Sequence, residues 1–185
     1  RIADPLKLLD CSPISDGAAA VVLSSKKTKR GIQVVASAVA TDSLGLAQRK
    51  KLTELAATRT ASQKAYAIAG IAAKDVDVAE VHDCFTIAEV LAMEDLGFFP
   101  KGQAAAAIAS GKTTLGNGKY VVVNPSGGLK GCGHPVGATG VKQIVELVEQ
   151  LRGVAGKRQV NGASVGLAHN VGGSGATAVV HILRK

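Results

Sequence analysis

Apolar positions along the chain fall into short continuous runs that alternate with faces of helical spacing. The short runs predict strands over residues 32–39, 76–81, 120–123, 159–168 and 176–183. Helical spacing predicts helices over residues 62–71, 85–96, 100–110 and 135–152. Strands that alternate with helices in this way favour an α/β fold, with helices covering the faces of a sheet.

The helix over residues 135–152 has the clearest pattern. One side carries only apolar residues: Val141, Ile144, Val145, Val148 and Leu151. The other side is polar and is predicted to face outward: Lys142, Gln143, Glu146 and Glu149. Pro135 has no amide hydrogen, so we expect it at the first helical position, where that hydrogen would be unpaired.

Two apolar segments of the chain resemble each other. Residues 17–23 and 175–181 agree at five of seven positions, at an offset of 158 residues. This weak repeat predicts the last strand of one unit followed by a complete second unit. The chain has 185 residues, begins with Arg1 and has its single methionine at Met93, so we expect a further segment upstream.

Composition narrows the function classes. The chain is 46% hydrophobic and 3% aromatic, with a formal net charge of +8, which excludes a disordered protein. Few aromatic side chains argue against a binder of single-stranded nucleic acid, and no nucleic-acid motif occurs. The basic runs at residues 26–30 and 49–51 are either solvated loops or a surface that attracts an anionic ligand such as a nucleotide phosphate.

The cysteines and the hydropathy pattern bear on location. Cys11, Cys84 and Cys132 form no CxxC pair and no disulfide framework, which is typical of a reducing compartment, and we expect a cytoplasmic protein. No segment reaches about 18 consecutive apolar residues, so no membrane span is expected.

Three histidines lie where predicted strands end. His82 precedes a predicted helix, His134 lies just ahead of the long helix, and His169 opens a glycine-rich loop. The start of a helix favours the neutral imidazole that a general base requires. Backbone amides of the glycine loop have the chemistry to hold an oxyanion. His181 lies inside an apolar strand and is interpreted as structural.

Several alternatives compete for these residues. Cys84 is either an inert core residue or a reactive cysteine whose pKa is lowered by a helix start and His82. The three histidines lack partner ligands at helical spacing, so no metal site is expected. A dinucleotide-binding fingerprint is incomplete, because Gly131-Cys132-Gly133 is not followed by its third glycine. A phosphate-binding loop is also incomplete, because Ala106 stands where the first glycine is required.

Four segments together resemble the thiolase family. Residues 133–140 match its Gly-His-Pro block, and residues 12–20 resemble the end of its N-terminal domain. The segment His82-Asp83-Cys84-Phe85 stands where many thiolases carry Asn-Glu-Ala-Phe, and residues 169–173 replace their Cys-x-Gly block. Both replacements are similar to sterol-carrier-protein-type thiolases and to archaeal and bacterial thiolase-like proteins.

This resemblance implies the C-terminal half of a thiolase. The expected fold is α/β, with layers in the order α-β-α-β-α and a C-terminal repeat built on a mixed five-stranded sheet covered by helices. Residues 1–30 would be the tail of the N-terminal repeat, and residues 31–185 would form the C-terminal domain.

The resemblance also implies acyl transfer on coenzyme A thioesters, by Claisen condensation or by thiolytic cleavage of a 3-oxoacyl-CoA, with no tightly bound cofactor. His134 would activate the nucleophile and help bind a thioester oxygen, while Cys84 would be the acid and base at the α-carbon. His82 would support the first oxyanion site. The second would be flanked by His169, Val171, Gly172 and Gly173. Ser12 falls where the family contacts the pantetheine of coenzyme A.

One element of the family pattern is missing from the sequence. Its nucleophilic cysteine lies in a small-residue motif of the N-terminal half, and no such motif occurs here. We therefore expect an N-terminal thiolase half, or a partner chain, to supply that cysteine, within a homo- or hetero-oligomer. Some relatives also pair with a protein that combines a zinc ribbon and an oligonucleotide-binding fold. The alternative is a non-catalytic thiolase-like subunit with a structural or acyl-CoA-binding role.

Overall fold

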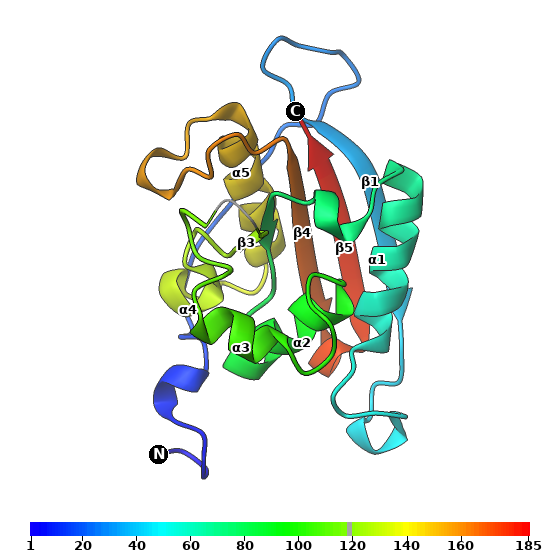
Figure 1. The fold of residues 1–185 in the computed structure, drawn as a ribbon, viewed down its shortest axis with the longest axis vertical. Coiled ribbons are helices and arrows are strands. Elements are labelled where there is room, and N and C mark those ends of the chain that lie inside the picture. The colour runs from blue at the N-terminus through cyan, green and yellow to red at the C-terminus, as the bar shows by residue number, and fades with distance from the viewer. Residues whose placement is uncertain (118–119) are drawn as a thin grey trace.

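A mixed five-stranded sheet forms the centre of the molecule (Figure 1). The computed structural model describes residues 1–117 and 120–185. The strands are β1 (Gln33–Thr41), β2 (Val78–Glu80), β3 (Val122–Val123), β4 (Val165–Gly172) and β5 (Thr177–Arg184). Their order is β1-β5-β4-β2-β3: β5 runs antiparallel to both β1 and β4, whereas β2 is parallel to β4 and to β3. The predicted fold class is confirmed.

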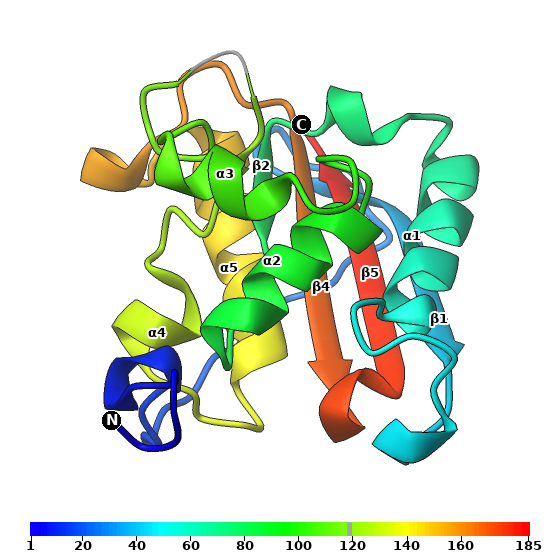
Figure 2. The same ribbon diagram turned by 60° about the horizontal axis from the view of Figure 1, so that its bottom comes forward.

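Helices cover both faces of this sheet. They are α1 (Ala56–Ala69), α2 (Thr86–Asp95), α3 (Ala104–Ala109), α4 (Gly128–Cys132) and α5 (Thr139–Arg152). Short 3₁₀ helices are η1 (Leu8–Asp10), η2 (Leu46–Gln48), η3 (Ala73–Asp75), η4 (Gly156–Arg158) and η5 (Gly173–Gly175). The first three α-helices share one apolar core with the sheet, and α5 forms a second core on the opposite face (Figures 1 and 2).

Small side chains bring α1 close to the sheet. Ala57, Ala61 and Ala65 are buried along one side of this helix. They meet the buried residues of β1, where Ala36, Ala38 and Ala40 alternate with exposed positions. An alternating strand with one buried face is the pattern that the sequence predicted, and alanine at the contact permits a short distance between helix and strand.

The long helix begins later than the sequence predicts. Pro135 is not its first residue, because α5 starts at Thr139. The carbonyl of Pro135 instead accepts the amides of Ala138 and Thr139, at 2.8 and 3.0 Å, and closes a turn ahead of the helix. The predicted strand over residues 159–168 is also displaced, since β4 begins at Val165 and continues to Gly172.

The burial of α5 corrects a second expectation. Gln143 and Glu146 were predicted to face outward, but both are buried. Each has polar partners that make burial tolerable: Gln143 bonds to backbone carbonyls of the sheet, and Glu146 is paired with Arg158 at 2.9 Å. The predicted apolar side is only partly covered, with Val141 and Val145 half-buried.

The segment of residues 13–23 runs along the molecule without regular structure. Ile14 is fully exposed and Val22 is 97% exposed. A strand needs a hydrogen-bonding neighbour, and residues 17–23 have none among the described residues, so the strand expected there is not formed. The domain boundary after residue 30 stays a prediction. In the described part of the chain, no helix combines the length and the apolar character that crossing a membrane requires.

Candidate functional site

The candidate site lies at the carboxyl ends of the parallel strands β2 and β4. Glu80 pairs with Ala168, the last pair in the register of these two strands. Two residues further along, His82 and Asn170 therefore come to lie at the same level. Side chains alternate along a strand, so both project toward the face that α5 covers. The ends of parallel strands are a common place for functional side chains in α/β folds.

His82 and His134 form the centre of the site. Their ring centroids lie 4.9 Å apart with an interplanar angle of 86°, an edge-to-face contact. His82 is buried, whereas His134 is half-buried and closer to solvent. Burial, followed by the proximity of His134, lowers the pKa of His82 to about 4, against an opposing hydrogen bond with Asn170. His82 is therefore neutral at physiological pH.

Thr139 determines which nitrogen of His134 carries the proton. Nδ1 of His134 lies 2.7 Å from the Thr139 hydroxyl, which donates its own hydrogen to the carbonyl of Pro135 at 3.1 Å. The hydroxyl oxygen therefore accepts the Nδ1 hydrogen, and Nε2 of neutral His134 carries a lone pair. This is the form of histidine that acts as a base.

Cys84 follows His82 by two residues, and the N-terminal segment joins its backbone to that of His134. The Ser12 amide donates to the Cys84 carbonyl at 2.9 Å, and the His134 amide donates to the Pro13 carbonyl at 3.0 Å. Ser12 thus lies next to Cys84 and one residue from the contact with His134. Burial raises the pKa of the Cys84 thiol, which corrects the expectation of a lowered pKa: the charged form loses more from burial than it gains from the Phe85 amide.

Asp83 fixes the loop that carries Cys84. Its carboxylate accepts the amides of Leu129 and Lys130, at 2.7 and 3.3 Å, at the start of α4. Gly128 leaves room for this contact, because a Cβ atom there would collide with the carboxylate of Asp83, and its φ of +59° also favours glycine. The loop after α4 leads directly to His134, so Asp83 connects the two halves of the site.

Two further carboxyl groups, those of Glu80 and Glu89, have pKa values raised by burial. Burial raises the pKa of Glu80 to about 7, although Ser126 donates to its carboxylate through both the hydroxyl, at 2.7 Å, and the amide. Burial, and then the charge of Asp83, raise the pKa of Glu89 to about 7. Asn124 joins Glu89 to the sheet by donating to that carboxylate and accepting the Val81 amide.

His169 is separated from the other histidines by the plane of the sheet. Its ring projects toward α1, where Nε2 lies 2.9 Å from the hydroxyl of Thr58, and both residues have no exposed surface. Burial, and then the proximity of His82, lower the pKa of His169 to about 3. The structure therefore brings the rings of His82 and His134 together, ties the Cys84 backbone to the Ser12–Pro13 segment that also holds His134, and places the His169 side chain on the other face of the sheet.

The glycine-rich segment after His169 is more regular than predicted. Val171 pairs with Ala178 and Gly172 pairs with Thr177, so both belong to the ladder between β4 and β5 rather than to a loop. Gly173 is the first residue of the turn, which is the short helix η5 (Gly173–Gly175). The expectation that the loop begins at His169 is therefore wrong, because β4 continues to Gly172, and the predicted oxyanion role of these amides stays a prediction.

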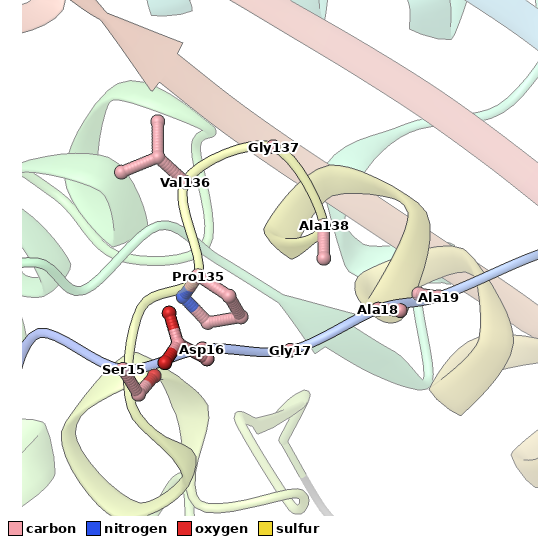
Figure 3. A pocket seen from close by; sticks show the side chains of 9 residues that line it. All are labelled: Ser15, Asp16, Gly17, Ala18, Ala19, Pro135, Val136, Gly137 and Ala138. Carbon is pink, nitrogen blue, oxygen red and sulfur yellow. The ribbon is translucent and has the colours of Figure 1, made fainter.

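An open groove runs along the segment that follows His134 in the sequence (Figure 3). Its volume is about 440 Å³, and it is lined by residues 15–19 on one side and 135–138 on the other. Figure 3 shows Asp16 and Gly17 alongside Pro135, and Ala18 approaching the start of α5. The side chains of His82, Cys84, His134 and His169 are not among the lining residues. Within residues 1–117 and 120–185, no group of three or more His, Cys, Asp or Glu side chains is placed to hold a metal ion.

Sequence reasoning missed the polar residues that hold the histidines in place: Thr58, Thr139, Gln143 and Asn170. Thr139 and Asn170 stand within the motifs that were recognised, so proximity in sequence was a usable signal. Thr58 and Gln143 lie on helices distant in sequence from their partners, and hydrophobic spacing assigned Gln143 to the wrong face.

Comparison with known proteins shows which family the chain belongs to. Residues 38–185 match the model of the thiolase C-terminal domain-like family. An acetyl-CoA acetyltransferase of Methanothermobacter thermautotrophicus is 50% identical over the whole chain, which covers 49% of that protein. Sterol carrier protein 2 of Rattus norvegicus is 45% identical over 96% of the chain and 34% of its own length. The chain thus spans about half, or less, of the curated relatives it matches.

A solved structure supports the fold independently. The Ltp2-ChsH2(DUF35) aldolase superimposes with a TM-score of 0.80 over 98% of this chain and 48% of that one, at 22% identity. At this low sequence identity, the superposition supports only the arrangement of the sheet and helices. The family match covers most of the chain and includes the strands β2 to β5 and the three histidines His82, His134 and His169. The chain belongs to the thiolase C-terminal domain family.

Proposed function

We propose that this chain supplies the C-terminal half of a thiolase-type active site, which joins or cleaves acyl groups on coenzyme A. The observation that carries the proposal is His134, held as a base by Thr139 and in edge-to-face contact with His82. Relatives named acetyl-CoA acetyltransferase support the same chemistry. The nucleophilic cysteine would come from an N-terminal half, and "the complete protein" below means this chain together with that half.

His134 would act in the first step. Its Nε2 lone pair would take the proton of the nucleophilic thiol, and the resulting thiolate would attack the carbonyl carbon of the 3-oxoacyl-CoA. Cleavage of the bond between the α- and β-carbons would leave an acyl-enzyme and the enolate of a shorter acyl-CoA. Coenzyme A would then release the acyl group as a new thioester.

Cys84 would protonate the enolate carbon. A thiol with a raised pKa retains its proton near neutrality, which suits an acid that delivers the proton in the cleavage direction. In condensation the same sulfur, as a thiolate, would remove the α-proton. His169 would support the site from behind, through its contact with Thr58, while the backbone from Val171 to Gly173 would border the second carbonyl oxygen.

The surface of the chain supports an N-terminal half at this position. Residues 13–23 are extended and expose Ile14 and Val22, and the groove beside Pro135 is open. The apolar side of α5 is only half-buried at Val141 and Val145. Ser12 lies beside Cys84, where the pantetheine of coenzyme A would pass. A homo- or hetero-oligomer and a zinc-ribbon partner stay predictions.

The test is thiolysis of acetoacetyl-CoA by free coenzyme A. The reaction is monitored through the loss of the absorbance of the acetoacetyl-CoA enolate. We expect activity from the complete protein, none from this chain alone, and none from the complete protein with His134→Ala. Robust thiolysis by the chain alone would refute the division of the site. Tight binding of acetoacetyl-CoA by an inactive complete protein would instead favour the non-catalytic alternative.

A further inference from the structure

The loop of residues 42–53, between β1 and α1, lies against the turn η5 that follows β4 (Figure 2). Leu44 lies so close to this turn that a Cβ atom on Gly173 would be 3.0 Å from Leu44 Cδ1. A strand rises about 3.3 Å per residue, so the turn begins about 10 Å beyond Asn170 in the direction of β4. The loop therefore borders the same end of the sheet as the candidate site.

The turn holds the side chain of Arg49, which belongs to this loop. Nη2 of Arg49 donates to the carbonyl of Ser174, a residue whose φ of 56° lies in the left-handed region. Gly175 leaves room beside this contact, because a Cβ atom there would lie 3.6 Å from Nη2 and only 2.7 Å from Leu55 Cδ2. Nε of Arg49 is buried. The guanidinium group is therefore held at one position beside the turn.

The positive charge of Arg49 has no counter-ion in the described part of the chain. Its neighbours Lys51 and Arg59 both pair with Glu54. Arg49 belongs to none of the ion pairs between described residues, although its side chain is half-buried. The other carboxylate of the loop, that of Asp42, accepts the amide of the next residue at 2.7 Å. A half-buried cation without such a partner favours the binding of an anion.

The free donors of Arg49 lie on one edge of its guanidinium group. The Ser174 carbonyl takes one hydrogen of Nη2, and the hydrogen of Nε is buried without a partner. Both hydrogens of Nη1 and the second hydrogen of Nη2 remain. Two parallel N–H groups of this kind match the two oxygens of a carboxylate, which is the strongest pairing that arginine makes.

Apolar side chains precede this cation on the same loop. Leu44 is 71% exposed and Leu46 is 53% exposed. The loop thus presents apolar surface together with one fixed positive charge. A methylene chain that ends in a carboxylate has the same two parts in the same order, whereas a phosphate group has no apolar part.

The position of Arg49 also distinguishes the acyl group from the phosphates of coenzyme A. Figure 2 shows the N-terminal segment, in blue, and the loop of residues 42–53, in cyan, on opposite sides of the end of β4. Ser12, where the pantetheine would pass, belongs to the N-terminal segment. A substrate that enters past Ser12 would therefore direct its acyl group, and not its phosphates, toward Arg49.

We propose that Arg49 binds the distal carboxylate of a dicarboxylic acyl group, so that the substrates are 3-oxo dicarboxylyl-CoA thioesters. Arg49 holds this carboxylate through Nη1 and Nη2, and Leu44 contacts the methylene groups between the carboxylate and the reacting carbon. The inference rests on the proposed function, because it names the substrate class of the same site. The bonds that form and break are those of the thiolytic cleavage described above.

Pairs of substrates with equal chain length test the proposal in the complete protein. 3-Oxoadipyl-CoA and 3-oxohexanoyl-CoA both have six acyl carbons and differ only at the distal end, which is a carboxylate or a methyl group. Pairs with eight and ten carbons extend the reach. We expect kcat/KM for thiolysis to be at least about tenfold higher for the carboxylate member of one pair or more, as one charge-assisted hydrogen bond predicts. Equal or lower values for all three carboxylate members would overturn the proposal.

Arg49→Gln tests whether this preference comes from the guanidinium group. Glutamine keeps a donor for the Ser174 carbonyl but removes the charge, so the ratio of the two kcat/KM values should fall about tenfold. Lys50→Gln is the matched control, because it removes the same charge from an exposed position of the same loop, and it should leave the ratio unchanged. An equal loss for both substrates in Arg49→Gln would show that Arg49 only positions the turn. That result, or a raised KM for free coenzyme A alone, would overturn the proposal.

A binding measurement separates this inference from the proposed function. Adipyl-CoA and hexanoyl-CoA lack the 3-oxo group, so calorimetric titration compares their affinities without cleavage. If adipyl-CoA binds more tightly to the wild type but not to Arg49→Gln, and no thiolysis occurs, the inference stands and the proposed function fails. If thiolysis proceeds without a preference at any length, the proposed function stands and the inference fails. Should Arg49→Gln not fold, Arg49→Lys decides, since it keeps the charge without the planar pair of donors and should lose most of the preference.

Discussion

The hydroxyl of Thr58 and Nε2 of His169 meet at 2.9 Å, although the two residues are 111 positions apart in the sequence. Neither residue has exposed surface. The contact links α1 to β4 directly behind His82. It satisfies a polar ring nitrogen in the apolar core that α1, α2 and the sheet share.

Thr58→Val should therefore reduce stability. Valine has the shape of threonine but leaves Nε2 of His169 buried without a partner, which costs about 1–3 kcal/mol. Chemical unfolding of the complete protein, with and without the substitution, measures this cost. Thr58→Ser keeps the hydroxyl and should recover most of the loss; equal losses in both variants would show that the methyl group, not the hydroxyl, matters.

Thr139→Ala should weaken the base. Without the hydroxyl, neutral His134 is free to place its proton on Nε2, where it cannot accept the proton of the nucleophile. We expect kcat/KM for thiolysis to fall about tenfold, because one hydrogen bond of about 1 kcal/mol or more then no longer selects the tautomer. Thr139→Ser should retain most activity. Wild-type rates in Thr139→Ala would exclude this role for the hydroxyl.

The sequence predicts the strands of this fold better than it predicts the hydrogen bonds between buried polar side chains. β1 and β5 are long strands whose apolar residues either alternate with polar ones or form a continuous run. Hydrophobic spacing therefore places both strands within two residues of their observed ends. Strand-end position places His82 after β2, next to the end of β4, as parallel strands require. The expectation that His134 also follows a strand is wrong, because His134 lies in the loop between α4 and α5. These features depend on local pattern and on topology alone.

Interactions between distant polar groups are what hydrophobic spacing misses. Gln143 is assigned to the outer face of α5 because glutamine is polar, yet its amide pairs with the sheet. The start of α5 is misplaced since Pro135 fits either a helical position or a turn, and the turn also satisfies Thr139. The pKa of Cys84 is misjudged for a related reason: its neighbours in sequence are known, but its burial is not.

Cys84→Ala should separate the two chemical steps. The nucleophile and His134 remain, so acylation by acetyl-CoA should stay measurable in the complete protein, while exchange of α-protons with deuterated water should be lost. Cys84→Ser is a matched control, because its hydroxyl keeps the size but holds its proton far more tightly than a thiol. Exchange at the wild-type rate in Cys84→Ala would remove Cys84 from the mechanism.

Glu80 should make the complete protein less stable as the pH rises toward neutrality. Its pKa is about 7 in the folded protein, compared with 4.5 for an ordinary glutamate, so the folded state holds a proton that the unfolded state releases between these values. This contribution to stability is fully present below about pH 4.5 and is lost as the pH rises through about 7.

The comparison with Glu80→Gln isolates this effect, since His82 and His169 titrate with the opposite sign but equally in both proteins. We expect the stability of wild type relative to Glu80→Gln to fall by about 1–3 kcal/mol between pH 4.5 and pH 7.5, measured by chemical unfolding. Ser126→Ala removes a donor to the charged carboxylate, so it should move the fall to higher pH. A difference that stays constant across this range would show that Glu80 is charged throughout, and that Ser126 and the nearby Lys142 outweigh its burial.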